Sequence, residues 1–267
     1  METAVARAPS THEQLEAAAW SDLVAACPEA LRRRLHLRSA RIGSVLVVRA
    51  SMIPDAAFNR ALCFDPTDPL PPGLLDDVIA AAGDGPPLEL QLPGALAADA
   101  EDDLRRRGFT LSGRMALLQR PTAPPPPVGT DFTVGPTEDG PAFGAAYAEG
   151  WDAPPIMGEL LAGVVGRRGW TAHAVRDGDR IVSTGLGYRV GDDEWFGFAS
   201  TVTDARTRGG QTVLVCSGLA RQQGLGIVRT FTEAVIPPGG ERNRSLDNLQ
   251  RLGFEVVAVR TCWRTSG

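Results

Sequence analysis

Apolar and polar residues recur in two different rhythms along this chain of 267 residues. Apolar spacings of three and four residues predict helices, because an α-helix makes one turn in 3.6 residues, and strict alternation predicts strands with one buried face. The expected helices cover Leu15–Cys27, 73–83, 94–108, 140–150, 157–169, 212–223 and 243–252. The expected strands cover 43–51, 88–92, 109–120, 131–135, 227–235 and 254–263, with three more between 171 and 201. This order of elements predicts an α+β fold.

Local signals support several of these boundaries. Ser10 and Glu13 have the spacing of a capping box in front of the first helix. Pro28 then ends that helix and suits the first turn of a second one. The segments 177–179 and 191–193 are rich in Asp and Gly, which predicts tight turns between the three central strands.

The segment "RPTAPPPPVGTDF", residues 120–132, divides the chain. Four consecutive prolines have no backbone N–H to give to a sheet, and they favour an extended spacer. We therefore expect a domain over 1–121, a Pro-rich linker over 122–128, and a second domain over 129–267.

Two distant segments resemble each other. "LRRRGFTLSGRMALLQR" (104–120) and "LQRLGFEVVAVRTCWR" (249–264) share Leu, Arg, Gly and Phe at matching offsets, and each reads as a helix end, a corner and a long strand. Coincidence is an alternative, because glycine at a helix end is common. We favour two structurally related halves, each closed by its own copy.

Composition narrows the classes of partner. With 43% apolar and 22% charged residues, the chain is typical of a globular protein, and no apolar run reaches the length of a bilayer span. The beginning of the chain has no apolar region typical of a secretory signal, so we expect a cytoplasmic protein without a membrane partner. A net charge of −5 argues against nucleic-acid binding.

The reactive side chains exclude other chemistries. The 4 cysteines and 3 histidines are scattered, which favours buried reduced thiols and gives no support to a metal site. The sequence contains no lysine, so a Schiff base and a Walker A phosphate loop are both excluded.

The strongest chemical signal is "DARTRGGQTVLV", residues 204–215, between a predicted strand and a predicted helix. Gly209 and Gly210 allow a ligand to approach the backbone, and the first amides of the helix are free to bind a phosphate. Arg206 and Arg208 add positive charge. A plain glycine turn with solvated arginines is the alternative.

This loop resembles the R/Q-x-x-G-x-G/A coenzyme A loop of the GNAT N-acetyltransferases, and especially a subgroup whose loop reads R-G-R-G-V-Q-T-A-L. Downstream, "PPGGERNRSLDNLQRLGF" resembles the Pro-Gly, Ser-x-x-Asn and Arg-x-Gly-Phe segment of the same subgroup. The resemblance covers about residues 131–264. Through "FNRALCF" (58–64) and its closing strand, the first half resembles a degenerate GNAT-like domain without a cofactor loop. The resemblance implies tandem GNAT-like domains, each with a mixed, mostly antiparallel sheet flanked by helices.

The resemblance also implies a binding site for acetyl-CoA, the acetyl donor of these enzymes. Strand backbone at Thr201 and Val202 would contact the acetyl and pantetheine groups, and Asn248 would approach the pantetheine or its sulfur. For Arg251 two roles are equally open: contact with a phosphate of the cofactor, or a solvated position on the surface of the helix. The residues expected to surround the pyrophosphate are Arg206, Arg208, Gly209, Gly210, Gln211 and Thr212.

The catalytic groups are less well defined by the resemblance. Many GNAT enzymes carry a tyrosine acid four residues before the Gly-Phe glycine, where this chain has Leu249. Glu194 and Glu233 are two candidates for the base that deprotonates the amine. The candidate substrate residues are Tyr147, Glu149 and Asp152.

These inferences predict an acyltransferase that moves an acetyl group directly from acetyl-CoA to a small-molecule amine. The negative net charge favours a cationic acceptor. A non-catalytic coenzyme A-binding or interaction protein is the alternative, and other acyl chemistry on the same fold stays open. The sequence leaves the oligomeric state undetermined.

Overall fold

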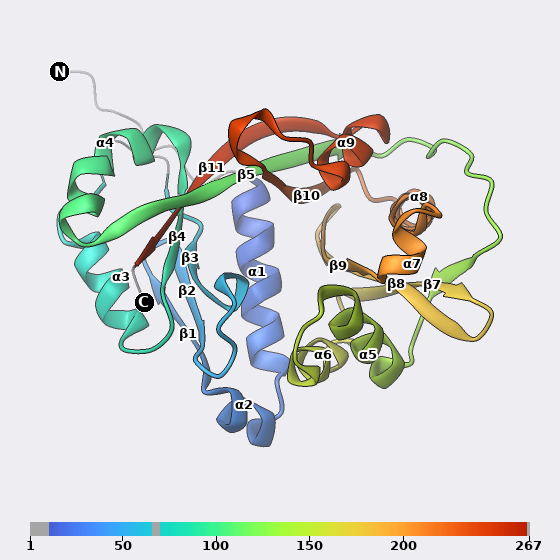
Figure 1. The fold of residues 1–267 in the computed structure, drawn as a ribbon, viewed down its shortest axis with the longest axis horizontal. Helices are drawn as coiled ribbons and strands as arrows, with labels where there is room; N and C mark the ends of the chain where they lie inside the picture. Colours follow the sequence, from blue (N-terminus) through green and yellow to red (C-terminus); the bar gives the residue numbers. More distant parts are fainter. Residues whose placement is uncertain (1–10, 66–69, 266–267) are drawn as a thin grey trace. The chain divides into compact units, whose positions relative to one another are not determined.

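The computed structural model describes residues 11–65 and 70–265, and these form an α+β fold, as predicted (Figure 1). The α-helices are α1 (Thr11–Ala26), α2 (Glu29–Leu35), α3 (Leu74–Ala82), α4 (Gly94–Arg106), α5 (Gly140–Trp151), α6 (Pro155–Ala162), α7 (Thr203–Arg206), α8 (Gly210–Gly224) and α9 (Arg244–Arg251). The strands are β1 (Leu37–Ile42), β2 (Val45–Ala50), β3 (Asn59–Leu62), β4 (Glu89–Pro93), β5 (Phe109–Pro121), β6 (Thr133–Pro136), β7 (Trp170–Asp177), β8 (Arg180–Val190), β9 (Asp193–Thr201), β10 (Arg229–Ile236) and β11 (Glu255–Thr265).

The sequence pattern missed three short elements. Strand β3 has four residues and α7 a single turn, which is too short for a clear period, and β1, as long as β2, is mostly exposed and lacks a regular alternation of apolar and polar residues. The expected helix over 157–169 ends at Ala162, because the chain then enters turns that lead to Gly166 in a left-handed conformation. The capping role expected for Ser10 lies outside the described residues.

The chain forms two compact units that do not coincide with its two sequence halves. The first unit takes the described residues up to Leu117, Val235–Glu241, and the residues from Val257 onward. The second unit takes Leu118–Ala234 and Arg242–Val256. Residues 257–265 and 235–241 therefore pack with the first unit, although both segments fall within the expected second domain. The linker assignment for 122–128 stays a prediction.

In the first unit the strand order is β1-β2-β3-β4-β11-β5. Strands β1, β2 and β3 are antiparallel neighbours, and β3 runs parallel to β4. Val45 and Val47 pack with Val78 of α3 and Leu96 of α4 in one apolar cluster. Alternate residues point to the other face, which α1 covers (Figure 1).

Strand β11 completes the sheet of the first unit, and this corrects the expectation that each repeat closes its own half. Residues 260–264 pair antiparallel with β4, from Arg260 opposite Pro93 to Arg264 opposite Glu89. The repeat is present, but the strand of the second copy lies in the first unit. A local sequence pattern cannot reveal where β11 pairs, because it carries no information about which distant strand is its partner.

A fully buried group of charges joins β11 to α1. Arg260 is 0% exposed and donates to both carboxylate oxygens of Glu13 at 2.7 Å, while its Nη1 lies 2.6 Å from Glu16. Arg60 of β3 donates to Glu16 at 2.7 Å and lies over the ring of Trp20. Burial acts to raise the pKa of Glu16, but the two arginines outweigh burial and lower this pKa to about 2.

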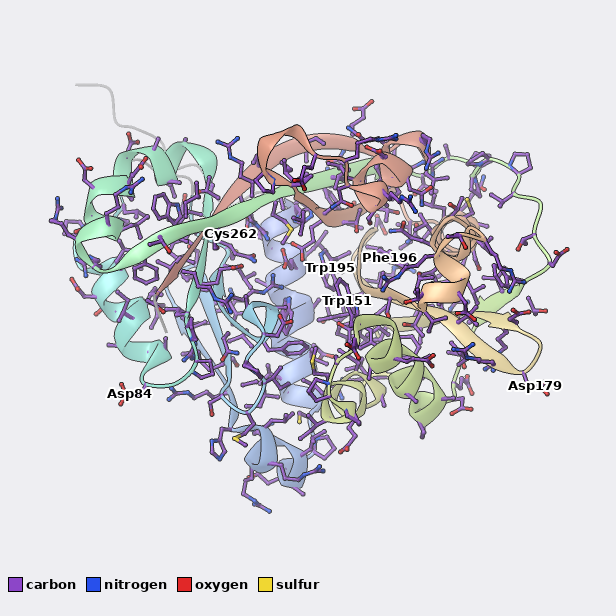
Figure 2. All side chains as sticks on the ribbon, viewed as in Figure 1. Asp84, Trp151, Asp179, Trp195, Phe196 and Cys262 are labelled. Atoms are coloured by element: carbon purple, nitrogen blue, oxygen red, sulfur yellow. The ribbon has the colours of Figure 1, made fainter. Side chains whose placement is uncertain are left out.

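The second unit has the strand order β10-β9-β8-β7-β6. Helix α8 covers one face, where Phe196 packs beside Gly185 and Gly218. Trp195, the preceding residue (labelled with Phe196 in Figure 2), packs edge-on against Phe198. Helix α5 covers the opposite face through Ala146, which packs with Ala174 and Ile181.

Helices α5 and α6 approach each other closely at Gly144 and Gly158. A Cβ added to Gly144 would lie 2.3 Å from the carbonyl oxygen of Gly158, and one added to Gly158 would lie 2.2 Å from that of Gly144. Only glycine fits at this crossing. The contact fixes the position of α5, whose C-terminal end reaches the end of β9.

Within the described residues, the helices are all too short or too polar to span a bilayer.

Candidate cofactor site

Strands β9 and β10 of the second unit are parallel, and they pair over only a short distance. Their ladder joins Arg229–Phe231 to Asp193–Trp195. Both strands continue beyond this ladder, β9 as far as Thr201. The structure describes both strands throughout, and the pairing stops where they separate. Beyond Trp195, within the described residues, the edge of β9 toward β10 is therefore no longer paired, while its other edge stays paired with β8 as far as Thr201.

A bulge interrupts β9 in this separated region. The register with β8 changes between Leu186 opposite Gly197 and Thr184 opposite Ser200, which leaves one extra residue in β9. Phe198 has a φ of 47°, a left-handed conformation that is costly for an aromatic residue. Nε1 of Trp151, at the end of α5, donates to the carbonyl of Ala199 at 3.0 Å. Bulges of this kind redirect backbone groups and are frequent beside functional sites.

Helix α8 begins at the end of β9, after α7 and a short turn. Its N-cap is Gly209, with a φ of 83° and no atom within 4 Å of the position that a Cβ would take. The first N–H groups of a helix have no partner within the helix, and the helix dipole adds positive charge there. Helix α8 thus starts at the glycine pair of the loop, and the binding of a phosphate by its first N–H groups stays a prediction.

A cleft of about 540 Å³ lies at this N-terminus, between the loop and α9. Four arginines and one acid line the cleft, and Asp247 is held by Arg242 through bonds of 2.7 and 3.0 Å. An excess of arginine beside free helix amides is a suitable environment for a polyanion. The lining residues are Arg206, Thr207, Gly209, Gln211, Thr212, Arg242, Arg244, Asp247, Asn248 and Arg251.

Polar side chains fix α9 onto the first turn of α8. Gln211 donates to Ser245 at 2.6 Å, and Thr212 donates to Asn248 at 2.9 Å. The amide of Asn248 donates in turn to Gln211 at 3.3 Å. The structure thus brings Gln211, Thr212 and Asn248 together, as expected of one site. In this arrangement their side chains bind one another and position the walls of the cleft.

The two arginines of the loop have different roles. Arg206 lines the cleft, and its guanidinium also donates to the carbonyls of Thr201 and Gly150. Arg208 instead forms an ion pair with Asp177, and its guanidinium lies 4.4 Å from the centre of the Phe132 ring. The hydrogen bond that Arg208 donates to Asp177 raises the pKa of Arg208. The structure therefore directs Arg208 away from the residues that line the cleft.

The expected backbone contacts at the end of β9 already have partners. The N–H of Val202 donates to Val182 at 3.0 Å, and the carbonyl of Val202 accepts from Ala205 and Arg206. The hydroxyl of Thr201 is bonded to Ser183 at 2.7 Å. These bonds hold the loop that leads to Gly209, and direct contact of Thr201 or Val202 with a cofactor stays a prediction. Gly210 is buried within the first turn of α8.

The two candidate bases lie in different environments. Glu194 is only 2% exposed, lies within the paired part of β9, and accepts a bond from Gln222 of α8. Burial raises the pKa of Glu194, and the bond from Gln222 offsets this only in part. Glu233 is half-buried on β10, beyond the ladder. Leu249, where the resemblance places a tyrosine acid, is 4% exposed and packs in the interior.

The candidate substrate residues do not form a single cluster. Tyr147 is buried in α5, and its carbonyl accepts from Ser200 at 3.0 Å. Glu149 is exposed and forms an ion pair with Arg180, which also bonds Asp204 at 3.1 Å. Asp152 caps the C-terminal end of α5 with a φ of 51°. Their substrate role stays a prediction.

Three further residues that line the cleft were not predicted from the sequence: Arg242, Arg244 and Asp247. The sequence contained an indication of this wall, because "ERNRSLDNLQR" places three arginines among the ten residues 242–251, at and within the predicted helix. The density of arginine around a predicted helix start would have identified this second wall.

Comparison with known proteins shows similarity in fold. No protein-family model and no curated protein sequence matches this chain. A GCN5-related N-acetyltransferase from Kribbella flavida aligns with a TM-score of 0.61 at 15% identity, covering 97% of this chain and 96% of its own. One from Sphaerobacter thermophilus gives 0.62 at 17% identity, covering 98% and 95%. A tandem GNAT protein from the clavulanic acid biosynthesis pathway gives 0.54 at 15% identity, covering 97% of both chains.

Proposed function

The chain has the GNAT fold in its two-domain form, and we propose that it is an N-acetyltransferase that moves an acetyl group from acetyl-CoA to a small-molecule amine. Such a transfer needs a site for the polyanionic donor, access for the amine, and a group that accepts the amine's proton. The second unit offers a candidate for each of these requirements.

The arginine-lined cleft at the start of α8 is the observation that carries this proposal. Coenzyme A bears a pyrophosphate and a further phosphate, which suit free helix amides flanked by guanidinium groups. Gly209 is open to the solvent, and Arg242, Arg244 and Arg251 face the same cleft. The separation of β9 from β10 then leaves space for the acyl end of the donor beside the bulge at Phe198.

The geometry favours Glu233 over Glu194 as the base. An amine reaches the reaction as an ammonium ion and must lose a proton before it attacks the thioester carbonyl. Glu194 is buried in the closed part of the strand pair and bonded to Gln222, whereas Glu233 lies where the strands have separated. A carboxylate in the open region, acting directly or through water, is the better proton acceptor.

The first test closes the cleft with Gly209→Glu. A side chain at a φ of 83° strains the turn, and the carboxylate would repel phosphate groups, so we expect loss of acetyl-CoA binding measured by calorimetry. Gly226→Glu is the matched control, since Gly226 has a φ of 69° and equal open space at the other end of α8. Unchanged affinity in the Gly209 variant would remove the loop from the proposal.

The second test compares the two acids. Glu233→Gln is expected to lower the rate of thiol release by about 100-fold or more, the range typical of a lost general base. Glu194→Gln should lower this rate by less than about 3-fold, because a buried hydrogen-bonded acid away from the opening has no proton to accept. The reverse ranking would transfer the role of base to Glu194.

A non-catalytic coenzyme A-binding protein is the second candidate, favoured by the buried leucine at position 249. Without a tyrosine there, the leaving thiolate lacks the acid that many GNAT enzymes supply. Coenzyme A thiolate is stable enough to leave without this help, so loss of the acid is compatible with transfer. Tight binding of acetyl-CoA without turnover on a panel of polyamines, amino sugars and amino acids would favour this second candidate.

A further inference from the structure

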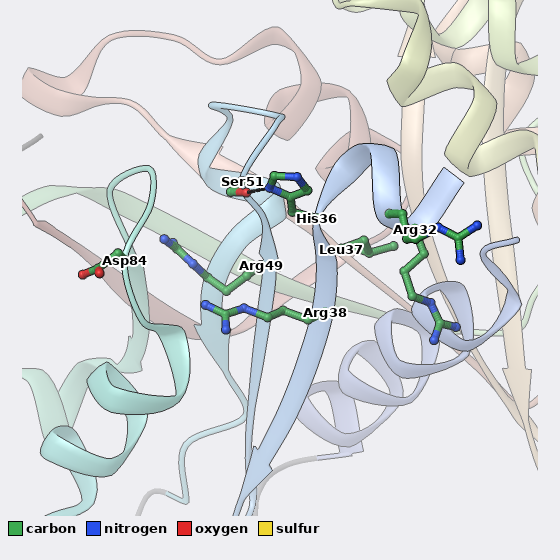
Figure 3. A pocket seen from close by; sticks show the side chains of 8 residues that line it. Arg32, His36, Leu37, Arg38, Arg49, Ser51 and Asp84 are labelled. Carbon is green, nitrogen blue, oxygen red and sulfur yellow. Dashed lines mark hydrogen bonds between the residues drawn. The ribbon is translucent and has the colours of Figure 1, made fainter. Parts of the chain in front are cut away.

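The first unit contains a second cationic cavity, unrelated to the cleft at α8. It has a volume of about 690 Å³ and lies where the end of α2 meets the strands β1 and β2 (Figure 3). Its walls carry Arg38, Arg49, His36 and Ser51, with Asp84 at one side. Arg32 and Arg33 also line it, and both lie near the carboxylate of Glu29.

Arg38 and Arg49 form a pair of like charges in this cavity. They are directly opposite each other in the ladder between β1 and β2, so their side chains leave the same face of the sheet. Figure 3 shows both guanidinium groups extended toward the loop that carries Asp84. Among residues 11–65 and 70–265, neither guanidinium has a carboxylate within ion-pair distance.

Arg49 is the unusual member of the pair, because it is buried and incompletely bonded. It is 3% exposed, and its Nη2 donates to the carbonyl of Pro86 at 2.7 Å. Within the described part of the chain, its Nε and Nη1 atoms have no hydrogen-bond partner. Burial and the nearby charge of Arg38 lower the pKa of Arg49. A buried guanidinium whose N–H donors lack acceptors lowers the free energy of unfolding, unless an anion or another acceptor pairs with it.

The loop after α3 lies against these two guanidinium groups. A Cβ added to Gly83 would lie 2.8 Å from Nη2 of Arg38, and one added to Gly85 would lie 2.9 Å from Nη2 of Arg49. Both glycines have positive φ, 57° and 143°. Arg38 also donates to the carbonyl of Ala82 at 2.5 Å, at the C-terminal end of α3. The loop therefore holds both cations in place.

Neutral polar groups complete the wall. Nδ1 of His36 lies 3.0 Å from the hydroxyl of Ser51, and both residues line the cavity next to Arg49. A hydroxyl and an imidazole bind oxyanions readily, through an O–H or N–H donor. The arrangement has two charges, additional donors and space for a small molecule.

We propose that this cavity binds a small molecule that carries an oxyanion, a phosphate or a carboxylate group. The oxyanion lies against Arg38, which is exposed, and the buried charge of Arg49 stabilises it from behind. The site is separate from a cofactor loop of the GNAT kind, because it adjoins the C-terminal end of α3 and the β1 edge of the sheet. The first unit thus keeps a ligand site of its own.

The experiment uses the full chain with Gly209→Glu, which closes the other cationic site. Inorganic phosphate and citrate are titrated separately at constant ionic strength, with calorimetry for the dissociation constant and thermal unfolding for Tm. We expect saturable binding of at least one probe. Arg38→Gln should weaken that binding about tenfold, the loss of one charge-assisted contact. Arg114→Gln, an exposed arginine of the same unit outside the cavity, should leave binding unchanged.

Each outcome decides the proposal. Binding of phosphate alone identifies a phosphate-bearing ligand, and binding of citrate alone identifies a carboxylate-bearing one. Absence of saturable binding for both probes would overturn the site. Binding that Arg38→Gln leaves unchanged would overturn it too, and a lower Tm in that variant would then assign the arginine pair to holding the loop after α3. None of these readouts depends on acetyl-CoA, so failure of the proposed activity leaves the test intact.

Discussion

Each unit contains a parallel pair of strands with a short ladder, and the surroundings of the two pairs differ. In the first unit β4 pairs with β3 on one side and with β11 along the other, from residue 89 to residue 93. In the second unit the pairing of β9 with β10 stops after Trp195 and Phe231. The region around β4 is closed, because β11 covers β4 from Glu89 to Pro93 and Arg260 of β11 is fully buried, whereas the chain after β9 leads to an arginine-lined cleft. Similar short parallel pairs therefore lie in a buried region in one unit and beside a cleft in the other.

The arginines of the two regions differ in the same way. Arg260 and Arg60 are buried with two glutamates, so their charges are neutralised inside the first unit. The four arginines of the cleft at α8 line it together with a single aspartate, which pairs with Arg242, and this leaves an excess of positive charge for a ligand. The paired arginines of the first unit therefore contribute to the stability of the fold, whereas the excess of arginine at the cleft suits the binding of an anionic ligand.

The largest expected effect tests the closed region. Arg260→Met leaves Glu13 and Glu16 buried with less compensation, which should lower the free energy of unfolding by about 3–5 kcal/mol. Arg229→Met is the matched control, because Arg229 makes a similar bidentate pair with Asp193 but is 39% exposed. The control should lose less than about 1 kcal/mol. Urea unfolding measures both, and equal losses would contradict the distinction.

An intermediate effect concerns the core of the second unit. His173 is 1% exposed, and burial with the nearby charge of Arg221 lowers its pKa to about 4, from an ordinary value of 6.5. Between these values the unfolded chain binds a proton that the folded chain does not, so stability falls as pH falls from 6.5 toward 4. Between pH 7 and pH 4.5, His173→Phe should reduce the loss in the free energy of unfolding by about 2–3 kcal/mol. Unfolding at pH 7 and pH 4.5 measures the difference, with His36→Asn, at an exposed position, as the control.

The smallest effect sharpens the description of the open region. Arg251→Gln removes one cation from the cleft and should weaken acetyl-CoA binding about tenfold, or roughly 1.4 kcal/mol. Arg208→Gln should weaken it less than about twofold, because Arg208 is paired with Asp177. Calorimetry distinguishes them, and a larger loss for Arg208 would return that residue to the cofactor site.

Local chemistry explains what could be predicted from the sequence. The glycine pair before an apolar helical run located the start of α8, because backbone freedom and free helix amides are properties of a short segment. For the same reason, the Asp and Gly residues at 177–179 predicted the turn at Gly178, and alternating apolar and polar residues predicted the strands on either side of it. Such features need only neighbouring residues.

What the sequence did not reveal depends on distant partners. Arg208 looked equivalent to Arg206, and only the position of Asp177 on another strand distinguishes the two. In its place beside β4, β11 brings Arg260 into contact with Glu13, and these two residues are separated by 247 positions in the chain. The cavity around Arg49 likewise forms only when β1, β2 and the loop after α3 come together. Spacing rules do not reach across such separations.

The position of β11 has a consequence for how the protein is made. Domains near the start of a chain usually fold as units while synthesis continues. Here Arg260, the partner of Glu13 and Gln91, is translated 247 positions after Glu13 and 169 positions after Gln91. Until then, α1 carries acidic groups that the finished fold buries, and β4 has an uncovered edge, a surface that invites pairing with other chains. A nascent chain of this protein is therefore expected to need protection by chaperones for longer than its first unit would suggest.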